Sequence, residues 1–207
     1  MSDKRLVHLV DDEEAIRRSV GFMLRAAGFD VIAYPSGVDF LAAAAKAAPG
    51  CLLIDIRMPE IDGLEVQRLL AERGLDFPIV VLTGHGDIGL SVRAIKAGAI
   101  DFIEKPFEKA ALMRAIEEAF ALLGAADPPE SDATEALQRL AVLTPRENDV
   151  LVGLVRGQPN KITAYELSIS TRTVEVHRAN LMHKLDVRSL SDVLRIAFAA
   201  GVDAEPS

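Results

Sequence analysis

The sequence of 207 residues predicts an α/β domain followed by a smaller all-α domain. In the first part of the chain, short apolar runs alternate five times with longer segments of helical periodicity. That alternation is typical of parallel strands joined by helices. From residue 144 onward, apolar residues recur only at helical spacing. We therefore expect two domains of different architecture.

The run from Leu52 to Pro59 is the most informative stretch of the first domain. It is short, apolar, and broken by one acid, Asp55. Its length and the closing proline favour a buried strand over a helix. Cys51, the only cysteine, precedes the run and is expected to be a buried structural thiol. One cysteine excludes an intrachain disulfide.

Each expected strand of the first domain is followed by a helix, and Gly28 and Gly98 close two of these helices. Strand length and spacing match a flavodoxin-like fold, a doubly wound five-stranded parallel sheet with helices on both faces. Periodicity does not give the strand order. Strands are expected at 6–10, 31–34, 52–55, 77–82 and 100–104. Helices are expected at 13–27, 36–48, 63–72, 87–97 and 108–123.

Residues 124–140 are expected to be a linker, because Pro128 and Pro129 interrupt regular structure. Its end, 132–140, could form a short helix. The second domain is expected at 141–202, after a first domain at 1–123. Thr144, Pro145 and Glu147 form a typical helix start with a cap and an acid three residues later. The four helices of the second domain are expected near 145–156, 160–167, 171–185 and 190–200.

Charge is distributed unevenly along the chain, whose net charge is −8. Residues 1–124 hold 14 basic and 19 acidic residues, whereas residues 140–199 hold 8 basic and 6 acidic residues. An acidic first domain and a mildly basic second domain suggest different partners. No apolar run approaches the roughly 20 residues of a membrane span. Without a visible signal peptide and with one cysteine, a cytoplasmic location with no membrane partner is expected.

Polar residues follow four of the expected strands at the same end. In a parallel sheet these ends converge on one crevice, where ligands bind. Clustered carboxylates repel each other and favour a divalent cation, and an all-oxygen ligand set fits Mg²⁺. A hydroxyl and an ammonium suit phosphoryl oxygens. The set therefore predicts a site where Asp55 attacks a phosphoryl group. Its members are Asp11, Asp12, Asp55, Thr83 and Lys105.

Residues 3–123 resemble the receiver domain of bacterial two-component response regulators. The resemblance rests on the Asp11–Asp12 pair, on Asp55 followed by Met58–Pro59 and Asp62–Gly63, on residues 83–86 (Thr-Gly-His-Gly), and on residues 105–107 (Lys-Pro-Phe). It implies that Asp55 receives phosphate from a histidine kinase. It also implies that Mg²⁺ is held by three carboxylates and one backbone carbonyl, those of Asp11, Asp12, Asp55 and Arg57. The Lys105–Pro106 peptide is expected to be cis.

The same resemblance implies a switch. Thr83 and Lys105 contact the phosphoryl group, and movement of Thr83 lets the aromatic ring of Phe102 turn inward. A plain core role for Phe102 is an equally good interpretation. Phosphorylation is then expected to promote a homodimer. The domain is a phosphoacceptor rather than an enzyme, with limited self-phosphorylation from small donors and limited self-dephosphorylation.

The second domain is expected to contain a helix-turn-helix, with a turn at residues 168–170. A small bundle that serves dimerisation is the alternative. The helix after the turn carries many hydrogen-bond donors, which favours DNA. These donors are Arg172, Thr173, His177, Arg178, Asn180, His183 and Lys184.

Residues 143–147, 160–161 and 170–178 resemble the DNA-binding domain of LuxR/NarL-type regulators. The domain order resembles FixJ-type regulators, which implies promoter DNA and RNA polymerase as partners. Glu175 could accept a hydrogen bond from a cytosine amino group or restrain a neighbouring arginine. Thr163 stands where the family usually has an apolar residue. Expected DNA contacts are Lys161, Arg172, Thr173, Glu175, Val176 and Arg178.

Two other functions fit less well. A haloacid-dehalogenase-type phosphatase also forms an aspartyl phosphate. That chemistry needs a second Asp two residues after the nucleophile, where this chain has Arg57. An RNA-binding antiterminator could share the first domain, but the helix at 171–184 and its preceding turn favour duplex DNA. The sequence therefore predicts a transcription factor controlled by phosphorylation.

Overall fold

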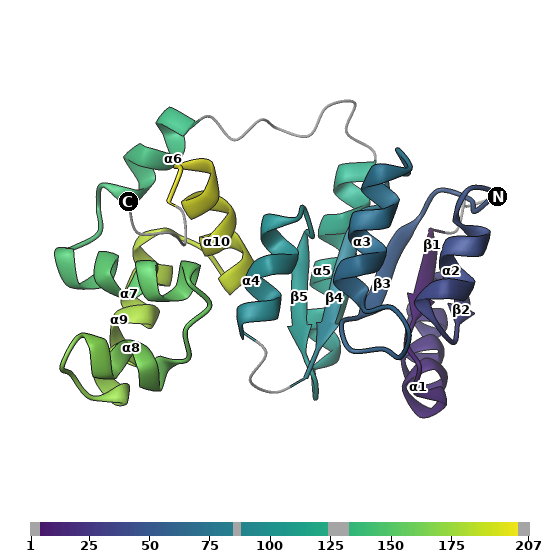
Figure 1. Cartoon of the computed structure of the whole chain (residues 1–207), viewed down its shortest axis with the longest axis horizontal. Coiled ribbons are helices and arrows are strands. Elements are labelled where there is room, and N and C mark those ends of the chain that lie inside the picture. The colour runs from purple at the N-terminus through teal and green to yellow at the C-terminus, as the bar shows by residue number, and fades with distance from the viewer. Residues whose placement is uncertain (1–4, 85–87, 124–132, 203–207) are drawn as a thin grey trace. The chain divides into compact units, whose positions relative to one another are not determined.

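The computed structural model describes residues 5–84, 88–123 and 133–202 (Figure 1). The chain divides into two compact units. One contains a β-sheet and the other is built from helices, as the change of sequence pattern predicted. No described helix combines the length and apolar composition that a membrane span requires.

The first unit is organised around a parallel sheet of five strands in the order β2-β1-β3-β4-β5. The expected doubly wound, flavodoxin-like fold is confirmed. The chain leaves β1 toward one edge and β3 toward the other, so β1 and β3 flank the point where the strand order reverses. Ligand crevices form at this point in such sheets. The strands are β1 (Leu6–Val10), β2 (Asp30–Tyr34), β3 (Cys51–Asp55), β4 (Ile79–Thr83) and β5 (Asp101–Glu104).

Two elements have an end that lies two residues or more from its expected position. β4 begins at Ile79 because Pro78 has no N–H to give to a ladder, although its carbonyl still accepts from the Leu52 amide (2.9 Å). The helix expected to run to residue 48 ends at Ala44. The backbone hydrogen bonds that follow join residues three apart, as in a 3₁₀-helix, rather than four apart. The helices that follow the strands are α1 (Glu14–Ala26), α2 (Gly37–Ala44), α3 (Gly63–Glu72), α4 (Ile88–Lys96) and α5 (Lys109–Leu123).

One part of the core lies on the face of the sheet that α1 and α5 cover. Alternate strand residues point to this face because side chains alternate across a strand. Those residues pack against apolar side chains of α1 and α5. The strand residues are Val7, Leu9, Leu53, Val80 and Leu82, and the helical residues include Val20, Leu24, Leu112 and Ile116. Cys51 belongs to the same cluster, and burial raises the pKa of its thiol to about 12.

His8 points to the opposite face and is wholly buried. Its Nε2 donates to the Ala48 carbonyl (2.9 Å), since a carbonyl oxygen can only accept. The neutral ring then leaves Nδ1 to accept from the Tyr34 hydroxyl at 3.4 Å. The rings of Phe40 and Phe77 lie 5.7 and 5.6 Å away, centroid to centroid. Burial lowers the pKa of His8, and the Ala48 hydrogen bond offsets only part of this effect.

The second unit consists of short helices, with which α4 is grouped. Four of them match the expected domain helices, and the possible helix in the linker is present as α6. Residues 124–132, the rest of the expected linker, lie outside the described residues. The helices are α6 (Ala133–Leu140), α7 (Pro145–Val155), α8 (Asn160–Glu166), α9 (Thr171–Lys184) and α10 (Leu190–Ala199).

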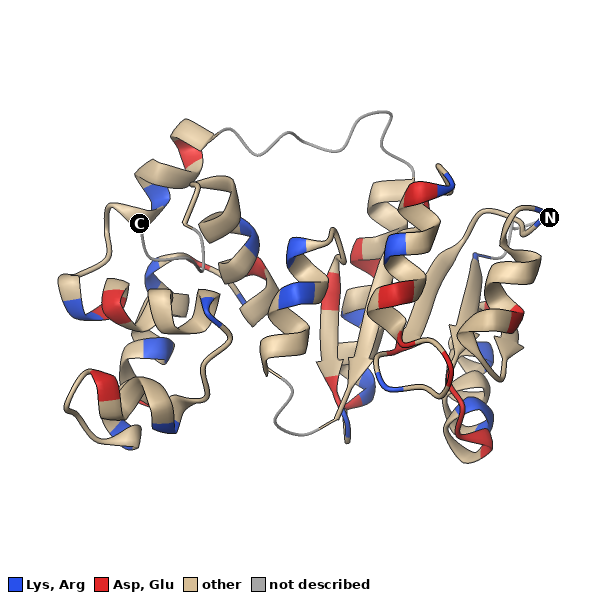
Figure 2. Cartoon of the chain, viewed as in Figure 1, with Lys and Arg blue, Asp and Glu red and all other residues tan. Residues whose placement is uncertain are grey.

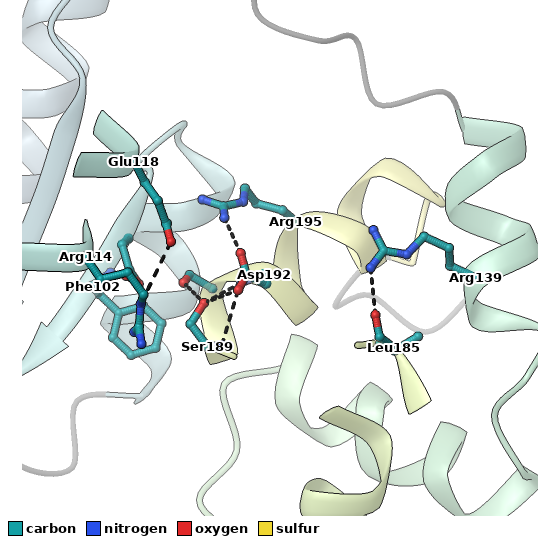
Figure 3. A network of polar contacts seen from close by, with 10 residues as sticks. Phe102, Arg114, Glu118, Arg139, Leu185, Ser189, Asp192 and Arg195 are labelled. Atoms are coloured by element: carbon teal, nitrogen blue, oxygen red, sulfur yellow. Dashed lines mark hydrogen bonds and ion pairs between the residues drawn. The ribbon is translucent and has the colours of Figure 1, made fainter. Parts of the chain in front are cut away.

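Capping fixes the starts of α7 and α10. Thr144 accepts from the Glu147 amide while the Glu147 side chain accepts from the Thr144 amide, so the expected capping box is present. Ser189 and Asp192 form a second box at α10, and Arg195 pairs with Asp192 (Figure 3). Arg139 of α6 donates to the Leu185 carbonyl (2.7 Å) just after α9 (Figure 3).

We expect the buried His8 to make the first unit sensitive to acid. Its pKa is lower in the fold than in the unfolded chain, whose ordinary value is about 6.5. The contribution of His8 to the free energy of unfolding should therefore be constant above that value and fall as the pH drops below it. Urea unfolding at pH 8 and pH 5.5 should show a larger loss for the wild type than for His8→Gln. Equal losses in both proteins would contradict this origin.

Candidate functional site

Strand register brings the expected tip residues to one edge of the sheet. Val10 is the partner of Ile54, so Asp11 and Asp55, the next residues, leave neighbouring strands side by side. Asp55 is in turn the partner of Leu82, one residue before Thr83. Thr83 is the partner of Glu104, and its carbonyl accepts from the Lys105 amide (2.8 Å). Acidic residues gather in the loops that follow β1 and β3 (Figure 2).

Lys105 joins the ends of three strands. Its Nζ lies 2.7 Å from Oδ2 of Asp11 and 2.8 Å from Oδ1 of Asp55. The Asp11 side chain is fully buried, and that of Asp55 is 10% exposed. The ammonium therefore balances two carboxylates that have little access to water.

Burial acts differently on the pKa values of Asp55 and Lys105. Burial raises the pKa of Asp55; Lys105 lowers it, and the charges of Asp11 and Asp12 raise it further. For Lys105, burial lowers the pKa, but the hydrogen bonds to Asp11 and Asp55 outweigh it and the pKa is raised. Asp55 is thus a carboxylate whose negative charge is incompletely balanced, beside a lysine that stays charged.

The carboxylates of Asp11 and Asp12 differ in their hydrogen bonds. Both Asp11 oxygens are occupied, since Oδ1 accepts from the Glu13 amide (2.9 Å) and Oδ2 from Lys105. Asp12 is exposed, and its carboxylate makes no hydrogen bond within the described parts of the chain. Asp12 is therefore the acid with open coordination positions.

Arg17 was missed by the sequence analysis. From α1, its Nη1 donates to the backbone carbonyls of Asp11 (2.6 Å) and Asp12 (2.8 Å). The available signal was its place in the second turn of a helix, one turn after an acidic start. A positive charge near a helix N-terminus opposes the helix dipole.

Other expected members of the site lie near it with weaker contacts. Thr83 is buried, and its Oγ1 donates to the Gly84 carbonyl at 3.4 Å, a long hydrogen bond. Phe102 is partly buried on β5, and the side chain of Arg57 is exposed. The Lys105–Pro106 peptide is cis, as expected. Residues 85 and 86 of the Thr-Gly-His-Gly motif lie outside the described residues.

The loop after β3 explains the Asp62–Gly63 part of the motif. Asp62 caps α3 by accepting from the Glu65 amide (2.7 Å). A Cβ at Gly63 would stand 2.5 Å from the Asp55 carbonyl, so only glycine allows this approach. The Gly63 amide also donates to the Ile56 carbonyl (2.9 Å). These contacts fold the loop back onto the end of β3.

The donor set suits Mg²⁺ by its chemistry. Among the residues described, no three acidic, histidine or cysteine side chains are gathered closely enough to hold a metal by themselves. Mg²⁺ commonly takes one or two carboxylates and completes its shell with water and phosphate. The open carboxylate of Asp12, beside Asp11 and Asp55, is consistent with this coordination of Mg²⁺.

The second unit contains the expected helix-turn-helix. Ser168, with φ of 55°, makes the turn after α8, and the Ile169 amide donates to the Ala164 carbonyl (3.0 Å). Ser170 caps α9 by accepting from the Thr173 amide (3.0 Å). Val150, Ala164 and Val174 form the buried contact among α7, α8 and α9.

The expected DNA contacts fall into two groups. Lys161, Arg172, Glu175 and Val176 are exposed. Arg172 pairs with Glu175 (3.2 Å), so Glu175 restrains an arginine, one of its two expected roles. Thr173 and Arg178 are engaged within the unit. Thr173 Oγ1 lies 2.8 Å from Ser170 Oγ, and Arg178 Nη1 donates to Asn160 Oδ1 (2.7 Å).

Arg178 and Glu147 tie α9 to its neighbours. Burial lowers the pKa of Arg178, against the opposing charge of Glu175. At the other end of α9, Lys184 Nζ lies 2.7 Å from the buried Glu147 carboxylate. The bond from Lys184, with that from the Thr144 amide, lowers the pKa of Glu147 to about 2. Thr163 is buried, and a Cβ at Gly153 would meet its hydroxyl at 2.7 Å, so a close helix approach accommodates this residue.

A doubly wound sheet with a lysine-bridged acid pair at its carboxyl edge defines a receiver domain, and helices α7 to α9 contain a helix-turn-helix. Residues 7–117 match the family described as response regulator receiver domain. Residues 141–197 match the bacterial regulatory proteins of the luxR family.

Several known proteins are similar to nearly the whole of this chain. The transcriptional regulatory protein FixJ of Rhizobium meliloti is 48% identical over 195 residues, which cover 94% of this chain and 96% of that protein. FixJ of Bradyrhizobium diazoefficiens is 42% identical over 202 residues, 98% of each chain. The crystal structure of full-length FixJ from B. japonicum aligns with a TM-score of 0.58 at 42% identity, covering 96% of this chain and 98% of that one. The chain belongs to the FixJ-type response regulators, which regulate transcription through a LuxR-type DNA-binding domain.

The contacts of α9 lead to a prediction on DNA binding. Arg172→Ala should reduce the slope of log affinity against log salt concentration by about 1, as expected for loss of a phosphate contact. Arg178→Ala should weaken binding with little change in slope, because its guanidinium is held by Asn160. Asn160→Ala should resemble Arg178→Ala. The measurement is a salt series on a duplex selected by the wild type from random sequences. Equal slope changes for both arginine variants would contradict this division.

Proposed function

We propose that Asp55 accepts a phosphoryl group from a sensor histidine kinase, with Mg²⁺, and that its phosphorylation controls dimerisation and promoter binding. The observation that carries this proposal is the Lys105 ammonium, 2.8 Å from Asp55 and 2.7 Å from Asp11 at one buried edge. A nucleophilic carboxylate, a fixed cation and an open acid are the parts that phosphoryl transfer requires.

In the proposed phosphoryl transfer, each side chain of the site has its own role. An oxygen of the Asp55 carboxylate attacks the phosphorus of a phosphohistidine. The new O–P bond forms as the N–P bond breaks, and the electron pair returns to the imidazole nitrogen, which takes a proton. Lys105 and the Thr83 hydroxyl then meet the phosphoryl oxygens. Mg²⁺, when bound, would supply positive charge to these oxygens. Asp11, Asp12, Asp55 and the Arg57 carbonyl would hold it.

The incomplete balance of charge at Asp55 supports its role as nucleophile. A carboxylate with a raised pKa holds its negative charge less favourably and is a stronger base. An acyl phosphate brings more negative charge to an edge where Lys105 already serves two acids. The proposed response is movement of Thr83 toward the phosphate and of Phe102 into the vacated space.

The proposed output is control of transcription from promoter DNA, together with RNA polymerase, in the cytoplasm. The second domain offers exposed residues on α8 and α9 with a net charge of only +2 over residues 140–199. Such a domain binds weakly and in a salt-sensitive way as a monomer. Two domains on two half-sites would combine their contacts. Dimerisation of the phosphorylated receiver would thereby raise promoter affinity.

Replacement of the acceptor tests the first step. Asp55→Asn should abolish labelling by acetyl phosphate and Mg²⁺, because the amide is a poor nucleophile. Asp76→Asn, at an exposed loop position, is the matched control and should label as the wild type does. Intact mass and radiolabel incorporation measure both. Labelling of Asp55→Asn at the wild-type level would overturn the assignment.

Association tests the second step. Sedimentation velocity of the wild type should show an increase from monomer to dimer on addition of acetyl phosphate and Mg²⁺. Asp55→Asn should stay at the monomer value under the same conditions. An unchanged sedimentation coefficient for fully labelled wild type would exclude dimerisation as the output of the switch.

A further inference from the structure

Arg17 makes a contact that neither the expected phosphoryl chemistry nor helix formation accounts for. A cation close to the N-terminus of a helix opposes the helix dipole, whereas Glu13 and Glu14 suit it. Arg17 directs one guanidinium nitrogen at two consecutive backbone carbonyls, those of Asp11 and Asp12. Side chains on a helix point back toward its N-terminus, so this reach is the natural one.

Two carbonyls held by one nitrogen fix two peptide planes. The peptide that follows Asp11 and the peptide that follows Asp12 cannot rotate without loss of a hydrogen bond to a charged group. Fixing these planes fixes the directions in which both side chains leave the backbone. The Asp11 carboxylate is then aimed at Lys105 and the Glu13 amide, and the Asp12 carboxylate remains open.

Arg17 and Lys105 balance the acidic edge in different ways. The Lys105 ammonium binds the carboxylates of Asp11 and Asp55 themselves, so an entering cation must compete with it. The Arg17 guanidinium adds positive charge behind the acids without contacting their carboxylate oxygens. Its contacts with the backbone therefore reduce repulsion among the acids without occupying metal positions.

We infer that Arg17 is a positioning residue for Mg²⁺: it holds the Asp11–Asp12 backbone so that the two carboxylates can receive the ion. The inference rests on the proposed phosphoacceptor function. Partners that orient metal ligands commonly change metal affinity by about 10- to 100-fold when removed.

Titration calorimetry of Mg²⁺ into the unphosphorylated full-length chain tests the inference. Arg17→Met should weaken Mg²⁺ binding by about tenfold or more. Arg17→Lys, which keeps the charge on a shorter stem, should fall between Arg17→Met and the wild type. Arg18→Met is the matched control, because it removes the same charge from the same helix. Arg18 is largely exposed and pairs with Glu14 (2.7 Å) instead of the Asp11 and Asp12 carbonyls. The Arg18→Met variant should bind Mg²⁺ as the wild type does.

Labelling by acetyl phosphate over a range of Mg²⁺ concentrations gives a second readout. Arg17→Met should need more Mg²⁺ for half-maximal labelling and reach the wild-type rate at saturation. Wild-type Mg²⁺ affinity in Arg17→Met would overturn the inference, as would a lower saturated rate with unchanged affinity. If Arg17→Met does not fold, Arg17→Lys decides, and unchanged affinity in that variant counts against the inference. A wild type that neither binds Mg²⁺ nor labels would instead remove the proposed function and this inference with it.

Discussion

The ion triad of Lys105 with Asp11 and Asp55 is the interaction on which the first unit's site depends. It joins Asp11 after β1, Asp55 at the end of β3 and Lys105 after β5, so one ammonium group links the ends of three strands. The Lys105 side chain is 18% exposed, and the acids less so. Removing one partner of such a buried set typically costs about 3–5 kcal/mol, because the remaining charges are left uncompensated. The sheet thus brings the acids together, and the lysine makes their proximity tolerable.

The division of labour in the second unit follows the same physical rule. Lys161 of α8 and Arg172 of α9 are exposed, although Arg172 pairs with its neighbour Glu175, while the partly buried Arg178 and the buried Glu147 have partners on other helices. Glu147 accepts from both Lys184 and the Thr144 amide, so one carboxylate joins the start of α7 to the end of α9. The charged groups that lose contact with water in this unit thus have a partner that offsets the cost of burial.

The elements of the fold were largely predictable from the sequence, whereas their ends were less so. Apolar runs and glycine caps identified every strand of the sheet and the helices between them. β4 begins later than its apolar run because Pro78 cannot donate, and α2 ends early in a tract of alanines that carries no stop signal. Strand order lies beyond periodicity, since each apolar strand can pair with several others. The site was predictable because parallel strands end at one edge, which brings Asp11, Asp55 and Lys105 into contact.

Two contacts that the sequence did not predict are made by long side chains. Arg17 reaches back along its helix to two carbonyls, and Arg178 reaches across to Asn160. The spacing of residues in the sequence does not determine either partner. An arginine side chain has four rotatable torsions, and these decide which group its guanidinium contacts. Spacing places backbones and short side chains well. It leaves open whether a given arginine meets solvent, a ligand or its own chain.

The burial of Cys51 in the sheet has a practical consequence. As the sole thiol of the chain, buried and with its pKa raised to about 12, it is expected to react poorly with thiol reagents in the native protein. A cysteine introduced at any exposed position would then be the single reactive group. Spin labels or fluorophores could be attached to either unit one at a time, without first removing the native sulfur from the core.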